Sequence, residues 1–459
     1  MKLTLLACVT FSLLVTLKAE PVTANHAGFF TPQRKGKMWD TWMYFNEGKF
    51  HLFYLGGDFL KWDAHALAVS PDGVHWEDRG TTLERSAGVI WMGTGHIWEA
   101  PDFAKSHTWI SNYSEHIGDK QDIKFATSTD LFHWTKADEK FHFVQDTRWY
   151  KAKGRWDCID TIKRADGGFY GYFTADPDPD KVKYKCCGFG FAESKDGLNW
   201  TALPPIEGDM TGEFGGIQQI GNKYFILISE GRVGVGDKPE GPFLAQKKNP
   251  NVFGEGCEIY FPRFFHNAPG GPLVNHFYNN DSGRNGDVYS GPLKAVEVDK
   301  EGTLRLKWWN GNEKLKAAEI ANSTREGGAS LKLLTEKLDL SHTYVMEGTV
   351  ETTQNAIASA IYFELENSQG RCLRFTNNTV QFGEIKADGS DFKGLQTSNR
   401  DLDMGVAKTF RLVFRHDMVE LYVNDHLMNL KRFIWNGQLG FISENSGDAF
   451  KNVRIWRSK

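Results

Sequence analysis

The sequence has little excess charge, few cysteines and few long apolar runs, and each shortage excludes a class of protein. Its 54 basic and 58 acidic residues give a net charge of −4, which provides no basic surface for nucleic acid or an anionic membrane. Beyond the N-terminal segment, no stretch is long enough to cross a bilayer. The five cysteines that follow Cys8 fit no zinc-binding spacing. We therefore expect buried thiols rather than a redox or zinc centre.

Long amphipathic helical patterns are also scarce, whereas turn signals are dense. The chain has 47 Gly and 15 Pro, and 14% of its residues are aromatic, including 15 Trp. Short apolar runs bounded by such turn residues predict mostly β structure. A length of 459 residues predicts two or three domains. Trp in this number suits sheet packing, and it also suits a surface that stacks on sugar rings.

The N-terminus has the pattern of a secretory signal peptide over residues 1–19. Lys2 supplies the positive charge, residues 3–17 form the apolar segment, and Ala19 fits the position before cleavage. The apolar segment is too short and too early for a convincing membrane span. The pattern predicts a secreted or periplasmic protein with no membrane attachment once the signal is removed.

Two phrases repeat along the first two hundred residues. An Asp-Thr pair opens a strand-like run at Asp40 and again at Asp160; a Gly follows eight residues later and an aromatic residue two after that. The pattern Ser-x-Asp-x-x-x-Trp occurs around Asp72, Asp130 and Asp196, at intervals of 58 and 66 residues. The Asp of this second phrase is expected to cap turn amides between the two outer strands of a unit, and the Trp to pack between units. Repetition at this spacing predicts a repeat architecture.

The repeats predict an all-β fold, a five-bladed β-propeller followed by a β-sandwich. Unit starts near residues 40, 98, 157, 213 and 256 divide a propeller domain at 25–316, which closes on itself and leaves no edge strands. The polar, Gly-containing stretch 317–330 is the predicted junction. Alternating strands without the repeated phrase then predict a sandwich over 328–459.

Several segments together resemble glycoside hydrolase family 32 and its cousin family 43. The family 32 likeness lies in 48–54, 65–76, 299–315, 410–425 and 440–456, and the family 43 likeness in 98–102 and 213–225. The resemblance covers almost the whole mature chain, and it depends on the order and spacing of the segments. It implies a five-bladed propeller with a glycosidase site at the centre.

The family pattern implies one acid from each of blades one, three and four, which here fall on Asp40, Asp160 and Glu213. In family 32 these would be the nucleophile, the residue that holds sugar hydroxyls, and the acid/base. Family 43 would make Asp40 a general base. Both schemes need one carboxyl that gives a proton to the leaving oxygen and one carboxylate for attack or water activation. No cofactor and no metal is implied, because the acids alone can run the reaction.

Other residues are candidates for the same site. Asp157 competes with Asp160, and Glu258 competes with Glu213. An acid beside a proline at a unit start, Glu99, is a candidate for binding a sugar hydroxyl. Three Trp near unit starts are candidates for stacking on sugar, although packing is the commoner role of Trp: Trp39, Trp62 and Trp98.

The sequence predicts a secreted, β-fructofuranosidase-like glycoside hydrolase whose partner is an oligo- or polysaccharide. The sequence departs from family 32 around each acid. Trp39 and Thr41 stand for the Asn before and the Pro after the first acid, Ile159 and Thr161 for the Arg and the Pro of the Arg-Asp-Pro motif, and Phe214 for the Cys after the acid/base. Two alternatives therefore stay open. One is a family 43-like arabinofuranosidase or xylosidase, and the other is a catalytically silent carbohydrate-binding propeller.

Overall fold

The computed structural model describes residues 27–32, 37–58, 61–254, 256, 258–278, 288–327, 330–352, 359–365, 369–386, 390–443 and 449–459. The predicted signal segment lies outside these residues. The described helices are short: α1 (Phe103–Ser106), η1 (Glu139–Phe141) and η2 (Asn310–Leu315). Within the described ranges, no helix has the length and apolar character that a bilayer crossing needs. The predicted all-β class is confirmed.

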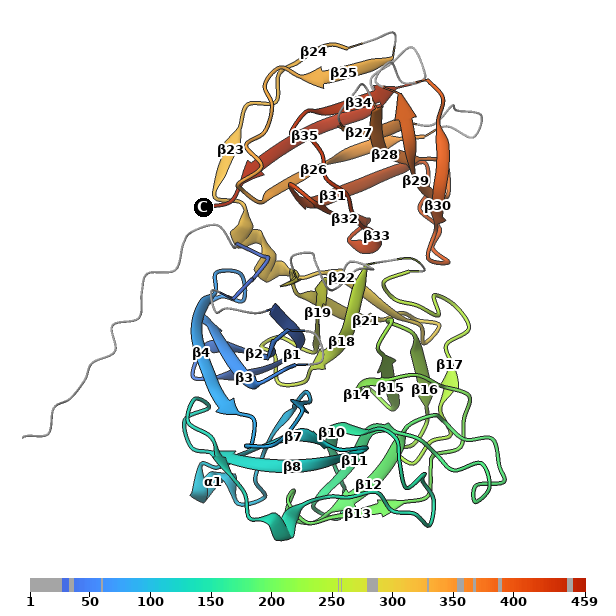
Figure 1. The fold of residues 1–459 in the computed structure, drawn as a ribbon. Helices are drawn as coiled ribbons and strands as arrows, with labels where there is room; N and C mark the ends of the chain where they lie inside the picture. The colour runs from blue at the N-terminus through green and yellow to red at the C-terminus, as the bar shows by residue number, and fades with distance from the viewer. Residues whose placement is uncertain are drawn as a thin grey trace, which may run out of the picture.

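Four antiparallel sheets follow one another along the first half of the chain (Figure 1). The first holds β1 (Lys37–Asn46), β2 (Lys49–Gly57), β3 (Ala64–Ser70) and β4 (Glu77–Glu84). The second holds β5 (Trp91–Met92), β6 (Ile97–Glu99), β7 (Trp109–Ile117), β8 (Lys120–Ser128) and β9 (Thr135–Lys136). The third holds β10 (Trp156–Lys163), β11 (Phe169–Ala175), β12 (Gly190–Ser194) and β13 (Trp200–Leu203). The fourth holds β14 (Phe214–Ile220), β15 (Lys223–Ile228), β16 (Val233–Gly236) and β17 (Leu244–Ala245).

A fifth group of strands completes a propeller-like ring. It comprises β18 (Ile259–Phe265), β19 (Leu273–Tyr278), β20 (Tyr289–Ser290), β21 (Lys294–Val298) and β22 (Leu304–Trp308). β18 packs against both β1 and β14, so the fifth group lies between the first and fourth sheets. It is not a separate sheet, because β22 pairs with β33 at Lys307 and His426. The propeller-like arrangement is confirmed, and the count of five blades stays a prediction.

Two sheets of the C-terminal half enclose one apolar core. The sheet continuous with β22 holds β23 (Ala318–Ile320), β26 (Tyr344–Glu351), β31 (Ala407–Arg415), β32 (Met418–Val423), β33 (His426–Arg432) and β35 (Phe450–Arg457). The other holds β24 (Thr324–Glu326), β25 (Leu331–Leu334), β27 (Ser359–Glu364), β28 (Gln369–Phe375), β29 (Val380–Lys386), β30 (Lys393–Ser398) and β34 (Leu439–Ser443). Phe363 of one sheet and Phe414 of the other meet edge to face, 6.2 Å between ring centres. The predicted junction at 317–330 already contains β23, which pairs with β35.

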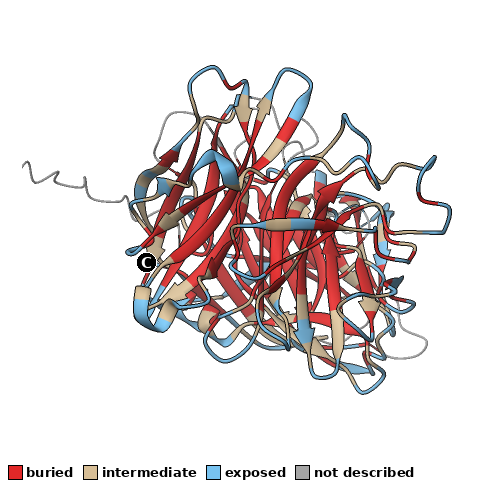
Figure 2. Ribbon diagram, turned by 90° about the horizontal axis from the view of Figure 1, so that it is seen from below, coloured by how far each residue is buried: buried red, intermediate tan, exposed pale blue. Residues whose placement is uncertain are grey.

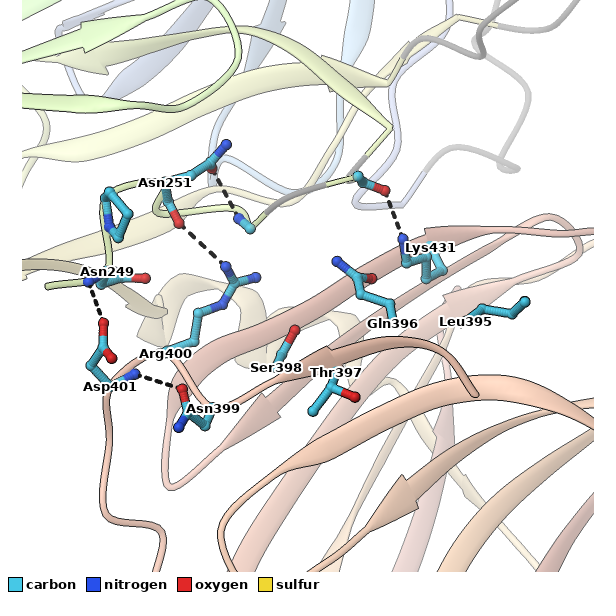
Figure 3. Close-up of a pocket in the computed structure, with 13 residues that line it drawn as sticks. Asn249, Asn251, Leu395, Gln396, Thr397, Ser398, Asn399, Arg400, Asp401 and Lys431 are labelled. Carbon is cyan, nitrogen blue, oxygen red and sulfur yellow. Dashed lines mark hydrogen bonds between the residues drawn. The ribbon is translucent and has the colours of Figure 1, made fainter. Parts of the chain in front are cut away.

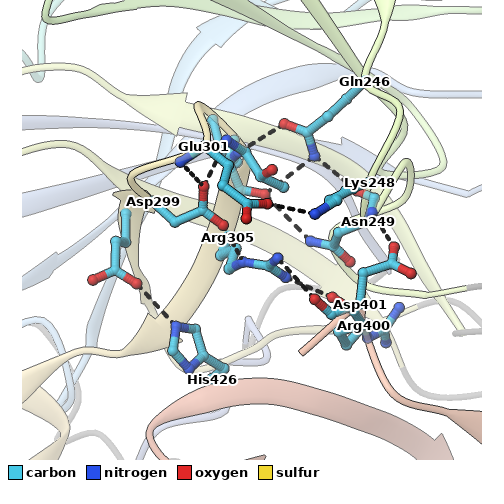
Figure 4. Close-up of polar contacts among 12 residues, drawn as sticks. Gln246, Lys248, Asn249, Asp299, Glu301, Arg305, Arg400, Asp401 and His426 are labelled. Carbon is cyan, nitrogen blue, oxygen red and sulfur yellow. Dashed lines mark hydrogen bonds and ion pairs between the residues drawn. The ribbon is translucent and has the colours of Figure 1, made fainter. Parts of the chain in front are cut away.

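Polar contacts join the two halves of the chain (Figure 4). The backbone N–H of Asn249 donates to Asp401 at 2.7 Å, and Arg305 donates to the carbonyl of Arg400 at 2.5 Å. His426 lies 2.9 Å from a carboxylate oxygen of Glu297. These bonds, together with the shared β22–β33 ladder, hold the C-terminal half against the ring.

The Ser-x-Asp-x-x-x-Trp phrase forms the same turn in each of its three copies. The Asp of each copy (Asp72, Asp130 and Asp196) accepts the backbone N–H groups two and three residues on, at 2.7–3.0 Å. The Ser hydroxyl accepts the N–H three residues after it at 2.8–2.9 Å. Trp200, at the end of the third copy, packs edge-on against Trp98 of the second sheet. The predicted roles of this phrase are therefore confirmed.

Most strands are buried, and the exposed residues lie mainly in loops, turns and outer strands such as β17 and β24 (Figure 2). Ionisable groups are rarely buried in a protein unless they are paired or functional. Here Asp157, Asp160 and Arg263 are all less than 5% exposed and lie on β10 and β18. Charged groups are thus buried on the inner strands of the ring, where a functional site is expected.

Candidate active site

A pocket of about 300 Å³ opens where the ring strands converge. Its walls combine carboxyl groups, an arginine, a tyrosine and three tryptophans. The lining residues are Trp39, Asp40, Leu55, Trp62, Trp91, Gly93, Thr94, Arg155, Asp157, Glu213 and Tyr260.

A larger hollow of about 540 Å³ lies between the two halves of the chain (Figure 3). Its charged groups are already engaged with protein partners. Arg400 donates to the carbonyls of Asn251 and Met428, and Lys431 donates to the carbonyl of Gly256. Among the described residues that line this hollow, Asp401 is the one carboxylate, so they do not supply the pair that acid/base chemistry needs.

A break in strand register positions the polar residue that each of four inner strands contributes to the pocket. Pairing shifts beside Asp40 in β1, beside Asp157 in β10, just after Glu213 where β14 begins, and beside Tyr260 in β18. Asp40 itself has a positive φ of 20°. Bulges bend a strand and turn a side chain out of the regular alternation. Four bulges at matching places therefore turn four polar side chains toward one centre.

Glu213 is held from both sides. One carboxylate oxygen accepts a short hydrogen bond from the Arg155 guanidinium, and the other accepts from the Tyr260 hydroxyl at 2.5 Å. The same Arg155 nitrogen lies 3.4 Å from Asp157. Because one guanidinium serves two carboxylates, Arg155 fixes the positions of both.

The pKa values of Asp40 and Asp157 are both raised. For Asp40 the main cause is burial, followed by the negative charges of Glu213 and Asp157, and the arginines Arg263 and Arg155 oppose these effects. Burial also raises the pKa of Asp157 and Glu213 adds to it, whereas Arg155 and a 2.5 Å hydrogen bond from a serine hydroxyl lower it. Carboxyl groups that raise one another's pKa titrate together. The site therefore retains a proton at pH values where an isolated Asp is already ionised.

Three tryptophans form the apolar wall of the pocket. Trp39 and Trp62 meet edge to face with ring centres 5.9 Å apart, and Trp62 meets Trp91 in the same way at 5.4 Å. The indole N–H of Trp39 donates to the carbonyl of Gly57 at 3.1 Å, which fixes the plane of its ring. Of the tryptophans proposed from the sequence, Trp39 and Trp62 lie at the pocket.

The close approach of strands requires a glycine at position 93. A Cβ there would lie 2.0 Å from the Ser114 hydroxyl and 2.6 Å from a carboxylate oxygen of Asp157. Any larger residue would push Ser114 away from Asp157 and break their hydrogen bond. Gly93 therefore belongs to the site although it has no side chain.

Asp160, which the resemblance placed among the catalytic acids, does not line the pocket. It is 1% exposed, and its carboxylate lies 2.8 Å from His96 Nε2 and 3.0 Å from His266 Nε2. Burial acts to raise the pKa of Asp160, but the two histidines outweigh burial and hold that pKa well below its usual value. The acid that the third sheet contributes to the pocket is Asp157, the rival noted in the sequence.

Three further candidates lie elsewhere. Trp98 is 5% exposed and packs edge-on against Trp200 of the third sheet. Glu99 accepts a hydrogen bond from the Tyr44 hydroxyl at 3.0 Å, outside the pocket. Glu258 accepts the backbone N–H of Arg432 at 2.8 Å, where the ring meets the C-terminal half. The geometry gives none of the three a place on the pocket wall.

Sequence reasoning missed Arg155, Tyr260 and Trp91. A signal for Arg155 was present: Arg155-Trp156-Asp157 brings an arginine close to an acid, as the Arg-Asp-Pro motif does. The repeated Asp-Thr phrase favoured Asp160 instead. Tyr260 and Trp91 carry no local signal, because their place at the pocket depends on how the strands bulge and meet.

Comparison with known proteins supports the fold. No protein-family model matches the sequence, and no curated protein sequence matches it. Among solved structures, fructofuranosidase from Schwanniomyces occidentalis complexed with fructose aligns with a TM-score of 0.68 and 14% identity, covering 95% of this chain and 99% of that one. Exo-inulinase from Aspergillus awamori aligns with a TM-score of 0.70 and 13% identity, covering 95% and 99%.

A Bombyx mori GH32 β-fructofuranosidase also aligns, with a TM-score of 0.70, 12% identity and 95% coverage of each chain. At such identities the likeness establishes the fold. It extends over both halves of the chain, so the resemblance to glycoside hydrolase family 32 expected from the sequence is confirmed at the level of the fold.

Proposed function

We propose that this chain is a glycoside hydrolase whose active site is the pocket that holds Asp40, Asp157 and Glu213. The observation that carries the proposal is the set of register breaks that turns these three carboxyls, from three different sheets, into one pocket beside a tryptophan wall. In this proposal the ring is a five-bladed propeller, and the two C-terminal sheets form a β-sandwich. Residues 1–19 direct the protein out of the cytoplasm.

The roles follow from position and chemistry. Glu213 is the acid/base, held by Arg155 and Tyr260. Asp40 attacks the sugar or activates water. Asp157 takes the role first given to Asp160, binding sugar hydroxyls and adding negative charge beside the reacting carbon. Cleavage of a glycosidic bond needs this division between a proton donor and an ionised carboxylate.

The proposed substrate is a furanoside in an oligo- or polysaccharide. The structural relatives include enzymes named for fructofuranosides and inulin, which favours a fructosyl unit. A second candidate, a family 43-like arabinofuranosidase or xylosidase, is favoured by Trp39, because an indole lies in the pocket wall where family 32 has an asparagine. Product analysis separates the two: fructose from sucrose, inulin or levan supports the first, and a pentose from arabinan, xylan or aryl arabinofuranosides supports the second.

Activity is expected to depend on pH through Asp40. Because its pKa is raised, the reactive carboxylate forms only above a pH higher than the value of about 4 for an ordinary aspartic acid. Arg155 lowers the pKa of both Asp40 and Asp157, so Arg155→Gln should move the acid limb of kcat/KM to higher pH. The check is a pH profile of kcat/KM for wild type and variant.

Arg148→Gln is the matched control for this profile. Arg148 is a surface arginine, paired with Asp146 and 65% exposed, and its loss should leave the limb in place. An acid limb that stays fixed or moves to lower pH in Arg155→Gln would show that Arg155 does not tune the reacting carboxyls.

Trp62 is expected to contribute to substrate binding. Trp62→Ala should raise KM about 2- to 10-fold with little change in kcat, since stacking on an aromatic ring contributes roughly 0.5–1.5 kcal/mol beyond buried area. Trp62→Phe keeps an aromatic face and should restore most of the loss. Steady-state kinetics on a soluble oligosaccharide measures both. If Trp62→Ala keeps the wild-type KM, the tryptophan wall does not contact the sugar.

A further inference from the structure

A second cluster of chemically active side chains lies at the centre of the ring. His96 precedes β6, Asp160 lies in β10 and His266 follows β18. The ligand atoms of the three residues all lie within 4.8 Å of one another. His96 Nε2 is 2.8 Å from Asp160 Oδ1, and His266 Nε2 is 3.0 and 3.2 Å from the two Asp160 oxygens. The three side chains thus point their ligand atoms at one point.

This cluster is separate from the proposed active site. β10 gives Asp157 to the pocket and Asp160 to the cluster. Tyr260 borders the pocket near the start of β18, whereas His266 follows the end of that strand. None of the three residues lines the pocket. The cluster therefore lies farther along the same inner strands, and the proposed hydrolysis does not use it.

Gln218, on β14, orients the imidazole of His266. Its Oε1 lies 2.7 Å from His266 Nδ1. With Nδ1 held by this contact, Nε2 is the ring nitrogen that faces the carboxylate of Asp160, 3.0 Å from Oδ1. Imidazole nitrogen and carboxylate oxygen are both donor atoms that transition-metal ions accept.

We propose that His96, Asp160 and His266 bind one divalent transition-metal ion of the Zn²⁺ type. Two imidazole nitrogens and one carboxylate oxygen form an accepted ligand set for such ions, whereas calcium and magnesium prefer oxygen ligands alone. Gln218 supplies the outer hydrogen bond that orients a metal-binding histidine. His96 and Asp160 are at most 3% exposed, and the His266 side chain is 24% exposed, which leaves one side open for entry. The ion would tie together the second, third and fifth strand groups of the ring.

The test is metal content and thermal stability of the full chain. Protein stripped with a chelator is titrated with Zn²⁺ alone, followed by calorimetry, elemental analysis after dialysis and Tm. We expect one Zn²⁺ per chain and a Tm that rises with Zn²⁺ concentration, because a ligand that binds only the folded state stabilises it. His266→Gln keeps an amide that can donate to Asp160 but removes the imidazole ligand, and it should weaken Zn²⁺ binding at least about 10-fold.

Two more variants keep the test decisive. His133→Gln removes an exposed histidine that also pairs with an aspartate, Asp130, at 2.7 Å, and it should leave binding unchanged. Gln218→Ala removes only the outer hydrogen bond and should weaken Zn²⁺ binding about 10-fold or more. This variant tests the proposal if His266→Gln fails to fold. The proposal is overturned if the wild type retains no stoichiometric Zn²⁺, or if His266→Gln and Gln218→Ala bind it as tightly as the wild type. Asp160 would then be held by hydrogen bonds to the two histidines instead of a metal.

Discussion

Glu213→Gln is expected to lower kcat/KM about 10²- to 10⁴-fold on a natural glycoside, the usual contribution of a positioned general acid. Glutamine keeps the size of the side chain and can still accept from Tyr260, but it cannot give a proton to the leaving oxygen. The loss should be much smaller on an aryl glycoside, because a good leaving group needs little protonation. Parallel kinetics on the two substrate types measure this difference.

Glu258→Gln is the control for that experiment. Glu258 accepts a backbone N–H from β33 at the contact between the two halves of the chain, so its replacement should change kcat/KM less than about 2-fold, as is usual away from reacting atoms. Full activity of Glu213→Gln together with loss in Glu258→Gln would move the acid/base role to the fifth strand group and overturn the assignment.

Asp40→Asn is expected to lower kcat about 10³-fold or more, because a residue that attacks or activates water cannot be replaced by a neutral amide. The fold should survive. Burial and the charges of Glu213 and Asp157 all disfavour an ionised Asp40, so a neutral side chain of the same shape should keep or raise the Tm. Loss of activity with unchanged or higher stability is typical of an active-site residue.

Glu99→Gln is the control variant for Asp40→Asn. Glu99 is a carboxylate of the neighbouring sheet that bonds Tyr44 outside the pocket, and its neutralisation should leave kcat within about 2-fold. If Asp40→Asn keeps most of its activity, or if it unfolds while Glu99→Gln loses activity, Asp40 is not the reacting carboxylate.

The sequence predicted best what is encoded locally. The Ser-x-Asp-x-x-x-Trp turn was predictable because its hydrogen bonds run within four residues, and all three copies form it. Strand alternation was enough for an all-β ring followed by further sheets. The pairing of β22 with β33 through Lys307 and His426 could not be predicted, because it joins residues more than a hundred positions apart.

The site was predicted in part. Asp40 and Glu213 line the pocket as expected, because both stand beside a register break in an inner strand. The third acid moved from Asp160 to Asp157 because the two acids occupy successive places along one strand. They pair with Tyr172 and Thr174, which are two residues apart on β11, and only Asp157 lies at the height of the pocket. A repeated motif cannot show which of two such acids reaches a pocket. Arg155, in the loop before β10, is placed by the fold around it.

The most direct test of the central claim is the release of reducing sugar by the purified wild-type protein, with binding to the same glycans measured in parallel. Sucrose, inulin, levan, arabinan, xylan and aryl arabinofuranosides form the panel. The proposed site predicts steady turnover of at least one of these, with release that continues until the substrate is consumed. Binding of a glycan in the panel without release of sugar would contradict the claim and make the pocket a carbohydrate-binding site.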